Sequence, residues 1–105
     1  MSFMTAQSGF WSGYYTQSDI RYPFSIQLFL GNFDGSVKGE GTDNIGNFMI
    51  NGSWRKLDGS VKFTKQYIGA HSVVYDGLLS PDGRHMDGKY TVGESVGDFH
   101  MEISR

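Results

Sequence analysis

Asp-Gly pairs recur in this chain at a constant interval of 24 residues, at Asp34-Gly35, Asp58-Gly59 and Asp82-Gly83. Asp-Gly between alternating apolar segments predicts a hairpin turn of type I′, which needs a positive φ at both central residues. A second set of turn signals lies about midway, at Asn44-Ile45-Gly46, Ile68-Gly69-Ala70 and Glu94-Ser95-Val96-Gly97. The chain is therefore predicted to reverse about every 12 residues, as an antiparallel meander does.

The segments between these turns alternate apolar and polar residues with the period of two that β-strands show. In the second segment, Phe24, Ile26 and Leu28 share one face, and Ser25 and Gln27 share the other. No comparable stretch shows the periodicity of a helix. The sequence predicts an all-β chain of about eight strands, over residues 9–16, 22–31, 36–42, 46–55, 60–67, 71–79, 85–92 and 97–104.

A sheet with one apolar face must bury that face, and no helix is predicted to cover it. Short hairpins without a long crossover favour an antiparallel up-and-down β-barrel over two packed sheets. We assign residues 9–105 to one barrel domain and residues 1–8 to a flexible leader. Asn51-Gly52 is itself a turn signal, but a turn there would break the 24-residue rhythm, so we place it in a strand. Glycines on the apolar face indicate a tightly coiled sheet: Gly39, Gly41, Gly52, Gly77 and Gly88.

The charge distribution argues against several classes of partner. The net charge is -2 with both signs scattered, so the chain lacks the basic stripe that nucleic-acid binding requires. It has no Cys, and its apolar stretches are too short for a membrane-spanning helix. Residues 1–8 do not resemble a secretion signal. We therefore expect a cytoplasmic location, with no nucleic acid, membrane or cofactor as partner.

Lys65 is the most informative exception to the strand pattern, because it lies on the apolar face between Phe63 and Tyr67. An unpaired buried ammonium is costly, so Lys65 must pair, reach a barrel mouth or shift its pKa. It is a candidate anchor for a carboxylate or phosphate of a ligand. The alternative is that its stem lies along the aromatic rings while the amine reaches solvent.

Tyr67, His71 and Tyr75 are predicted to line the same barrel end as Lys65, since a short turn joins their strands. Polar groups at the mouth of an apolar cup are where binding specificity usually resides. The alternative is that they are ordinary turn-flanking residues whose polar atoms lie at the rim.

A second polar group, made of His85, Asp87 and His100, alternates with apolar positions and is therefore expected on the outer face. His100 comes near the other two if their strands pair. Spacing alone does not define a metal cage, so we predict no metal ligands and interpret these residues as a dispersed surface set.

The start Gly9-Phe10-Trp11 resembles the Gly-x-Trp motif of calycins, the lipocalin and avidin group, and the run from Asp34 to Gly41 is similar to a turn and strand of avidin-like chains. The resemblance implies an eight-stranded up-and-down barrel in which the Trp plugs one end. The biotin-contacting pattern of avidins does not map onto this chain. The short connection from Gln17 to Arg21 replaces the long first loop of lipocalins, so a deep lipid cup is not expected.

These observations lead to three functional hypotheses. The first is a non-enzymatic module that binds a small, partly apolar ligand, with an anionic group considered because of Lys65. The second is an interaction or homo-oligomerisation domain with a filled interior, which would use outward apolar residues such as Phe29, Met49 and Val74. The third is an enzyme using His71 with Asp76 or Lys65, although no catalytic residue is assigned. For the first hypothesis we expect five lining residues: Trp11, Lys65, Tyr67, His71 and Tyr75.

Overall fold

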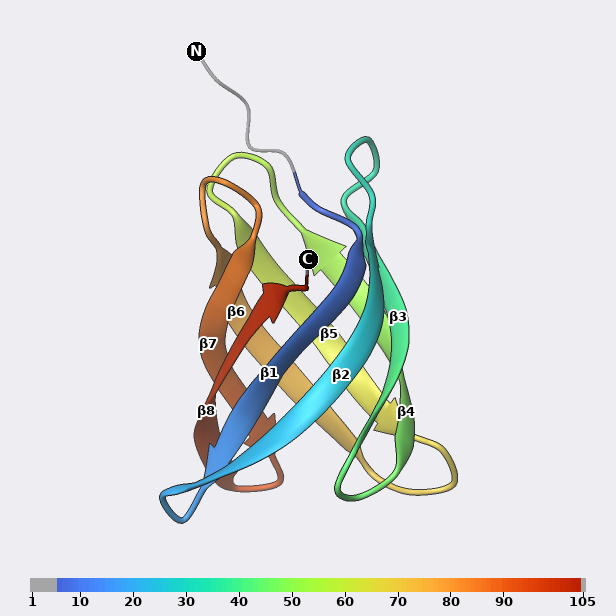
Figure 1. Ribbon diagram of the computed structural model, residues 1–105, viewed down its shortest axis with the longest axis vertical. Coiled ribbons are helices and arrows are strands. Elements are labelled where there is room, and N and C mark those ends of the chain that lie inside the picture. Colours follow the sequence, from blue (N-terminus) through green and yellow to red (C-terminus); the bar gives the residue numbers. More distant parts are fainter. Residues whose placement is uncertain (1–5, 105) are drawn as a thin grey trace.

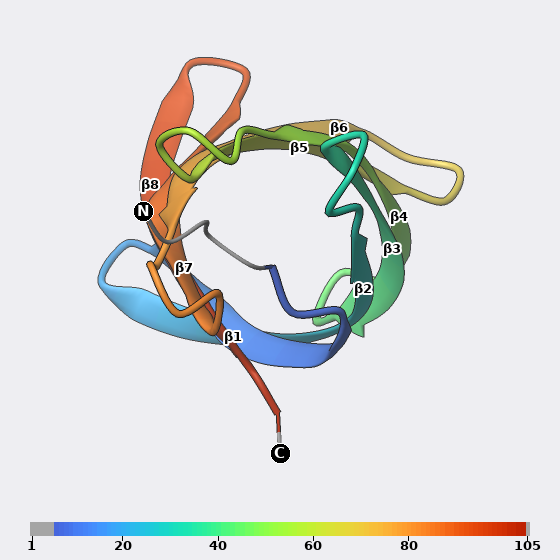
Figure 2. The ribbon, with the colours of Figure 1, turned by 90° about the horizontal axis from the view of Figure 1, so that it is seen from above.

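The chain forms a closed antiparallel barrel of eight strands in meander order, as the sequence predicted (Figure 1). The computed structural model describes residues 6–104. Viewed along the barrel, the strands form a ring around the interior (Figure 2). The strands are β1 (Gly9–Gln17), β2 (Ile20–Leu30), β3 (Ser36–Asp43), β4 (Asn47–Trp54), β5 (Ser60–Tyr67), β6 (Ser72–Leu79), β7 (His85–Val92) and β8 (Ser95–Ile103).

Closure comes from pairing between the first and last strands. Trp11 of β1 lies opposite Ile103 of β8, and Tyr15 lies opposite Phe99. Every other pairing joins strands that are neighbours in the sequence. Because the sheet meets itself, its apolar face is enclosed without help from a helix.

The interior is filled mainly by aromatic and branched side chains from alternate positions of every strand. Glycines make room for them, because an added Cβ at Gly41 would lie 2.8 Å from the Phe48 ring, and one at Gly97 2.6 Å from the Tyr90 hydroxyl. Gly52 lies within β4, as expected. The inward glycines therefore allow large rings to lie across the barrel.

The three Asp-Gly pairs lie at one end of the barrel, but their turns are not of the predicted type. Among the described residues, the positive φ falls on each glycine alone, at +69° in Gly35, +75° in Gly59 and +73° in Gly83. Each loop holds five residues between strands, and its Asp side chain accepts a backbone N–H two residues later, as Asp34 does from Ser36 at 2.9 Å. The prediction of type I′ turns was wrong because the Asp side chain stabilises a longer loop.

The pattern of a type I′ turn occurs instead at Ser18 and Asp19, where φ is +52° and +64°. Gln17 and Ile20 pair directly across these two residues, so β2 begins earlier than the predicted residue 22. Neither residue is Asn or Gly, the usual signals of this turn, so the sequence predicted a longer connection, from Gln17 to Arg21, in place of the two-residue turn.

The barrel has two different ends. We call the end with turns 31–35, 55–59 and 80–84 the plugged end, and the end with turns 18–19, 44–46, 68–71 and 93–94 the open end, which is the lower end in Figure 1. Residues 6–8 pack on the plugged end, where Ala6 is buried and its N–H donates to Asn32 Oδ1 at 3.1 Å. The rest of the predicted leader lies outside the described residues. The described residues include no helix suited to crossing a bilayer.

Candidate functional site

A cavity of about 540 Å³ lies at the open end of the barrel. Its volume falls within the range of roughly 300–1,000 Å³ that small-molecule sites occupy. Side chains of the strand ends form its floor, and the turns form its rim. The residues that line it are Tyr15, Thr16, Gln17, Ser18, Asp19, Ile45, Lys65, Tyr67, His71, Val73, Tyr75, Tyr90, Val92, Ser95, Val96, Gly97 and Asp98.

Four of the five residues expected to line a ligand site meet in this cavity, and the fifth, Trp11, does not. Trp11 is 1% exposed near the plugged end, and its indole Nε1–H donates to the Gln7 carbonyl at 2.9 Å. It precedes Tyr15 by four residues, which is about 13 Å along a strand at roughly 3.3 Å per residue. Trp11 therefore packs at the opposite end from the cavity. The four residues that line the cavity are Lys65, Tyr67, His71 and Tyr75.

Lys65 is buried and paired with Asp43, which comes from the end of β3. Lys65 Nζ donates to Asp43 Oδ2 at 2.8 Å, and the two side chains are 3% and 0% exposed. The Tyr67 hydroxyl donates to the same oxygen at 2.5 Å. The other oxygen of Asp43 accepts the N–H groups of Ile45 and Gly46 at 2.9 and 3.4 Å. One carboxylate therefore connects the β3–β4 turn to the cavity floor, and the Lys65 amine does not extend to solvent.

Aromatic rings surround the Lys65 ammonium on its remaining sides. A cation within about 6 Å of a ring centroid is attracted by the electrons of the ring face. These contacts and Asp43 together offset the loss of hydration that burial imposes on the charge. The ring centroids lie 4.9 Å from Nζ for Tyr15, Phe48 and Tyr67, 5.1 Å for Tyr75 and 5.8 Å for Phe24.

The environment of the pair shifts both pKa values downward. Burial lowers the pKa of Lys65 below its ordinary value of 10.5, and the contact with Asp43 opposes that change. Burial alone would raise the pKa of Asp43. The hydrogen bonds from Lys65, Tyr67 and the Ile45 N–H outweigh burial and hold the pKa of Asp43 below its ordinary value of 3.8. Asp43 is therefore a stable carboxylate at neutral pH.

Tyr75 contributes a polar group at the cavity floor. Its ring stacks on Phe63 with centroids 4.9 Å apart and planes 7° from parallel. The side chain is 2% exposed and lines the cavity, and its hydroxyl makes no hydrogen bond to another residue of the described range 6–104. Burial and the negative charge of Asp43 raise its pKa, so it is a neutral donor and acceptor.

Sequence reasoning missed three residues of the site, namely Asp43, Tyr15 and Tyr90. The Tyr15 hydroxyl donates to Asn44 Oδ1, and the Tyr90 hydroxyl donates to the Thr16 carbonyl, both at 2.6 Å. The signal that identifies them is strand alternation, because Tyr15 is in phase with Trp11, and Tyr90 and Asp43 are in phase with inward residues of β7 and β3. Asp43 directly precedes the turn signal Asn44-Ile45-Gly46, so its position in the sequence indicates a turn residue more readily than a partner for Lys65.

Of the two partners considered for His71, Lys65 lines the same cavity, but Asp76 does not lie near it. Its ring lies against Tyr67 at the rim, with centroids 5.0 Å apart. Asp76 is exposed on the outer face of β6, opposite Lys62 of β5. His71 and Asp76 therefore lie on different sides of the barrel wall.

No family model, curated protein or solved structure matches this chain. Its closed eight-stranded antiparallel barrel is consistent with the fold that the calycin resemblance implied. The function must therefore be inferred from the geometry of the cavity.

Proposed function

We propose that this protein binds a small, partly apolar and uncharged ligand in the open-end cavity, without catalysing a reaction. The observation that carries the proposal is a cavity of ligand size lined by Tyr75, whose hydroxyl makes no hydrogen bond within the described residues. Valines and tyrosine rings around it offer apolar contact, and the hydroxyl offers one directional hydrogen bond. The rim adds further polar side chains, among them Gln17, Asp19 and His71, so the cavity combines apolar walls with polar groups that could orient a ligand.

The charges around the cavity support an uncharged ligand over an anionic one. Asp43 already neutralises Lys65, and Lys89 pairs with Asp98 at the rim. A ligand carboxylate would have to displace Asp43 from Lys65, which would leave a buried carboxylate without its partner. The anionic ligand considered from the sequence is therefore the less favoured version of the proposal.

We also propose that the chain is a distant calycin. The support is the position of Trp11, the third residue of β1. It is buried and fills the plugged end, as the Trp of the Gly-x-Trp motif does in that group. The proposed binding site does not depend on this relationship, because it is argued from the cavity alone.

The binding proposal is tested with two matched fluorescent probes. Acetyl(dimethylamino)naphthalene is uncharged and has a ketone acceptor, and dimethylaminonaphthoate replaces the ketone by a carboxylate. We expect saturable binding of the ketone, with its emission shifted to the blue, and weaker binding of the carboxylate. Tyr75→Phe is expected to weaken ketone binding by about 1 kcal/mol, or roughly fivefold, because one hydrogen bond is lost.

Two further variants distinguish the cavity from other apolar surfaces. Val92→Trp places a large ring in the cavity and is expected to abolish ketone binding. Phe29→Ser, on the outer wall, is the matched control and is expected to leave it unchanged. Binding that survives Val92→Trp and is lost in Phe29→Ser would overturn the proposal. Native mass spectrometry of the purified chain then shows whether a natural ligand is retained.

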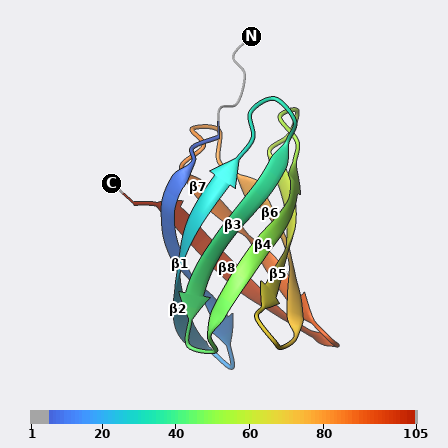
Figure 3. The same ribbon diagram turned by 90° about the vertical axis from the view of Figure 1, so that its right-hand side faces the viewer.

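The second candidate function is self-association through the outer wall of β1 to β4, most of which faces the viewer in Figure 3. Phe10, Phe29 and Met49 are 65%, 54% and 51% exposed on this wall, where polar residues are usual. Val74 is half-buried on β6, four strands from Phe29, so it does not join them. An apolar outer patch is typical of a protein interface. The proposed partner is a second copy of the chain. A wild type with the mass of a dimer in solution and a Phe29→Ser variant with the mass of a monomer would support self-association. A monomeric wild type would exclude it.

A further inference from the structure

Two histidines and two carboxylates form a compact group on the outer wall of the barrel, outside the open-end cavity. In the register of β7 and β8, His85 lies opposite Glu102, and Asp87 lies opposite His100. Their side chains alternate with buried Met86 and therefore point outward. The pairing thus gathers His85, Asp87 and His100, which the sequence indicated as a dispersed surface set, and adds Glu102 to them.

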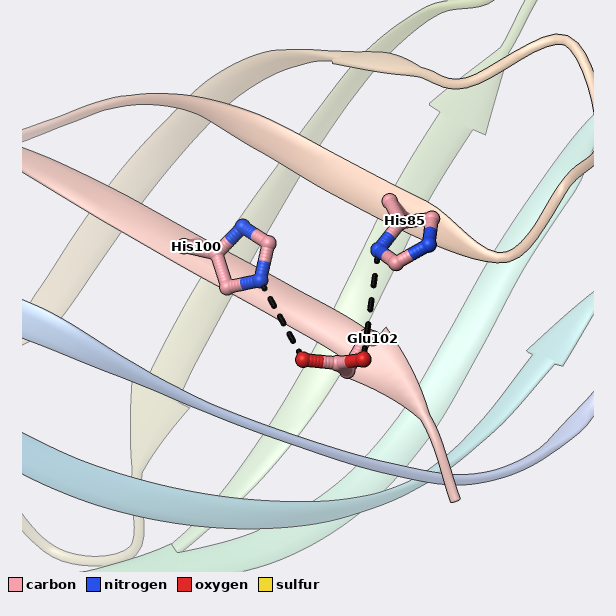
Figure 4. A group of neighbouring side chains, drawn as sticks. All are labelled: His85, His100 and Glu102. Atoms are coloured by element: carbon pink, nitrogen blue, oxygen red, sulfur yellow. Dashed lines mark ion pairs between the residues drawn. The ribbon is translucent and has the colours of Figure 1, made fainter. Parts of the chain in front are cut away.

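The ligand atoms of this group point toward one another (Figure 4). His100 Nε2 lies 3.5 Å from Glu102 Oε1, and His85 Nδ1 lies 4.0 Å from Glu102 Oε2. One atom from each of the three residues falls within 4.8 Å of the others. Three donors therefore surround one small volume of space.

Asp87 positions the His100 ring for this arrangement. His100 Nδ1 lies 2.6 Å from Asp87 Oδ1, and an ionised carboxylate accepts but does not donate, so the proton is on Nδ1. In the neutral ring, Nε2 then presents a lone pair toward Glu102. Two lone pairs facing each other repel unless a cation lies between them. A carboxylate that orients a histidine through its other nitrogen is the usual support of a metal-binding imidazole.

The spacing also fits a tetrahedral ion. Zinc binds imidazole nitrogen and carboxylate oxygen at about 2.0–2.1 Å, so two ligand atoms of a tetrahedral site are about 3.4 Å apart. The distance of 3.5 Å between His100 Nε2 and Glu102 Oε1 matches this value. His85 Nδ1 lies 4.0 Å from the other carboxylate oxygen, and the three ligand atoms lie within 4.8 Å of one another, so side-chain rotation has to bring His85 closer to the ion. Two imidazoles favour zinc, copper or nickel over calcium or magnesium, which prefer oxygen ligands.

We propose that His85, His100 and Glu102 form a binding site for a divalent transition metal of the zinc class, with Asp87 as a positioning residue. Three protein ligands leave one position for water or another donor. The two paired strands hold the ligands in place, and the His100 ring is partly covered by Tyr14, with centroids 5.7 Å apart. The site is independent of the ligand site proposed at the open end.

The test uses the full chain without an affinity tag, because a histidine tag would itself bind metal. Titration calorimetry with Zn²⁺ is expected to show one site per chain, and Co²⁺ is expected to give the visible absorption of a tetrahedral complex. His100→Ala and His85→Ala are expected to weaken zinc binding tenfold or more. Asp87→Asn is expected to weaken it by about 10–100-fold, as loss of a supporting partner does.

The third histidine of the chain supplies the matched control. His71→Ala, at the open end, is expected to leave zinc affinity unchanged. If His100→Ala does not fold, two other measurements test the site. One is the zinc affinity of Glu102→Gln, a substitution at an exposed position. The other is the NMR chemical shift of the wild-type imidazole nitrogens on adding Zn²⁺. Absence of zinc binding, or binding unaffected by both His85→Ala and Glu102→Gln, would overturn the proposal and identify the group as an ion-pair network around a protonated His100.

Discussion

The two ends of the barrel are built from the same eight strands by different means. The plugged end has three similar Asp-Gly loops, and its two indoles are buried with their N–H groups bonded to backbone carbonyls, Trp11 to Gln7 and Trp54 to Gly31, both at 2.9 Å. The open end has four dissimilar turns, a buried ion pair and a cavity. In this molecule, the end with similar loop sequences is filled by packed side chains, and the end with dissimilar turns holds the candidate site.

The difference also concerns the forces that stabilise each end. The plugged end depends on filled volume, because its two buried indoles pack inside the barrel and their N–H groups are bonded to the main chain. The open end is stabilised by hydrogen bonds and charge pairing between polar groups, since Asp43 accepts hydrogen bonds from Lys65, Tyr67 and the turn that follows it. Removing atoms should therefore damage the first end most, and removing charge should damage the second.

The largest effect is expected from Trp11→Ala. Truncation of a fully buried Trp at the plugged end should reduce the free energy of unfolding by about 3–5 kcal/mol, because it leaves a cavity. Urea unfolding followed by circular dichroism measures this loss. Affinity for the uncharged naphthalene probe, measured where the variant is still folded, should equal that of the wild type. A variant that stays stable but loses the probe would mean that the two ends are not separable.

Asp43→Asn is expected to reduce stability by about 3 kcal/mol, because removing one partner leaves the other buried and uncompensated. In this variant Lys65 can become neutral by losing its proton, because burial already lowers its pKa, and this limits the decrease in stability. The double variant Asp43→Asn/Lys65→Met should recover part of it, since no charge is left in the barrel. Urea unfolding of both variants at neutral pH tests this, and a double variant less stable than Asp43→Asn would contradict it.

The same pair predicts a specific dependence on pH. The pKa of Asp43 is lower in the folded chain than its ordinary 3.8, so its contribution is complete above that value and is lost as pH falls through the folded pKa. The difference in stability between wild type and Asp43→Asn should therefore shrink below pH 3.8. Asp58→Asn, in an exposed loop at the plugged end, is the control and should show a much smaller difference at every pH.

The smallest effect is expected at two glycines with similar backbone angles. Gly69 at the open end has a φ of +74° and free space around an added Cβ, so Gly69→Ala should cost about 1 kcal/mol for the left-handed conformation alone. Gly35 at the plugged end has a φ of +69°, and its Cβ would lie 2.6 Å from the Trp54 carbonyl oxygen. Gly35→Ala should therefore cost more in thermal or urea unfolding. Equal losses would show that the Gly35 loop relaxes freely.

The sequence predicted the strands and the closed barrel well because both depend on local signals. Alternation places Phe24 and Ile26 inward wherever their strand lies, and the turn signals divide the chain at regular intervals. The connection after β1 was predicted, but it was given as Gln17 to Arg21 because Ser18 and Asp19 are not the usual residues of a two-residue turn. Local signals also cannot show how strands are displaced along one another, and that displacement decides which side chains meet.

The candidate site was predicted only in part for that reason. Lys65 was recognised as unusual, but its partner Asp43 is on a strand that does not pair with β5, and the two meet only across the interior. Trp11 was predicted to line the site, but it precedes the lining residue Tyr15 by four residues along β1 and packs at the opposite end. Both errors concern position along the barrel axis, which alternation does not report.

The seam between β1 and β8 has a consequence for how the chain acquires its structure. Seven of the eight strand pairings join sequence neighbours, and one brings residue 11 against residue 103. Contacts between distant parts of a chain form slowly, because the intervening segment must first be ordered. A nascent chain on the ribosome can form its hairpins early, but it keeps two unpaired strand edges until β8 emerges. That interval, before the seam closes, is when this protein is most exposed to aggregation.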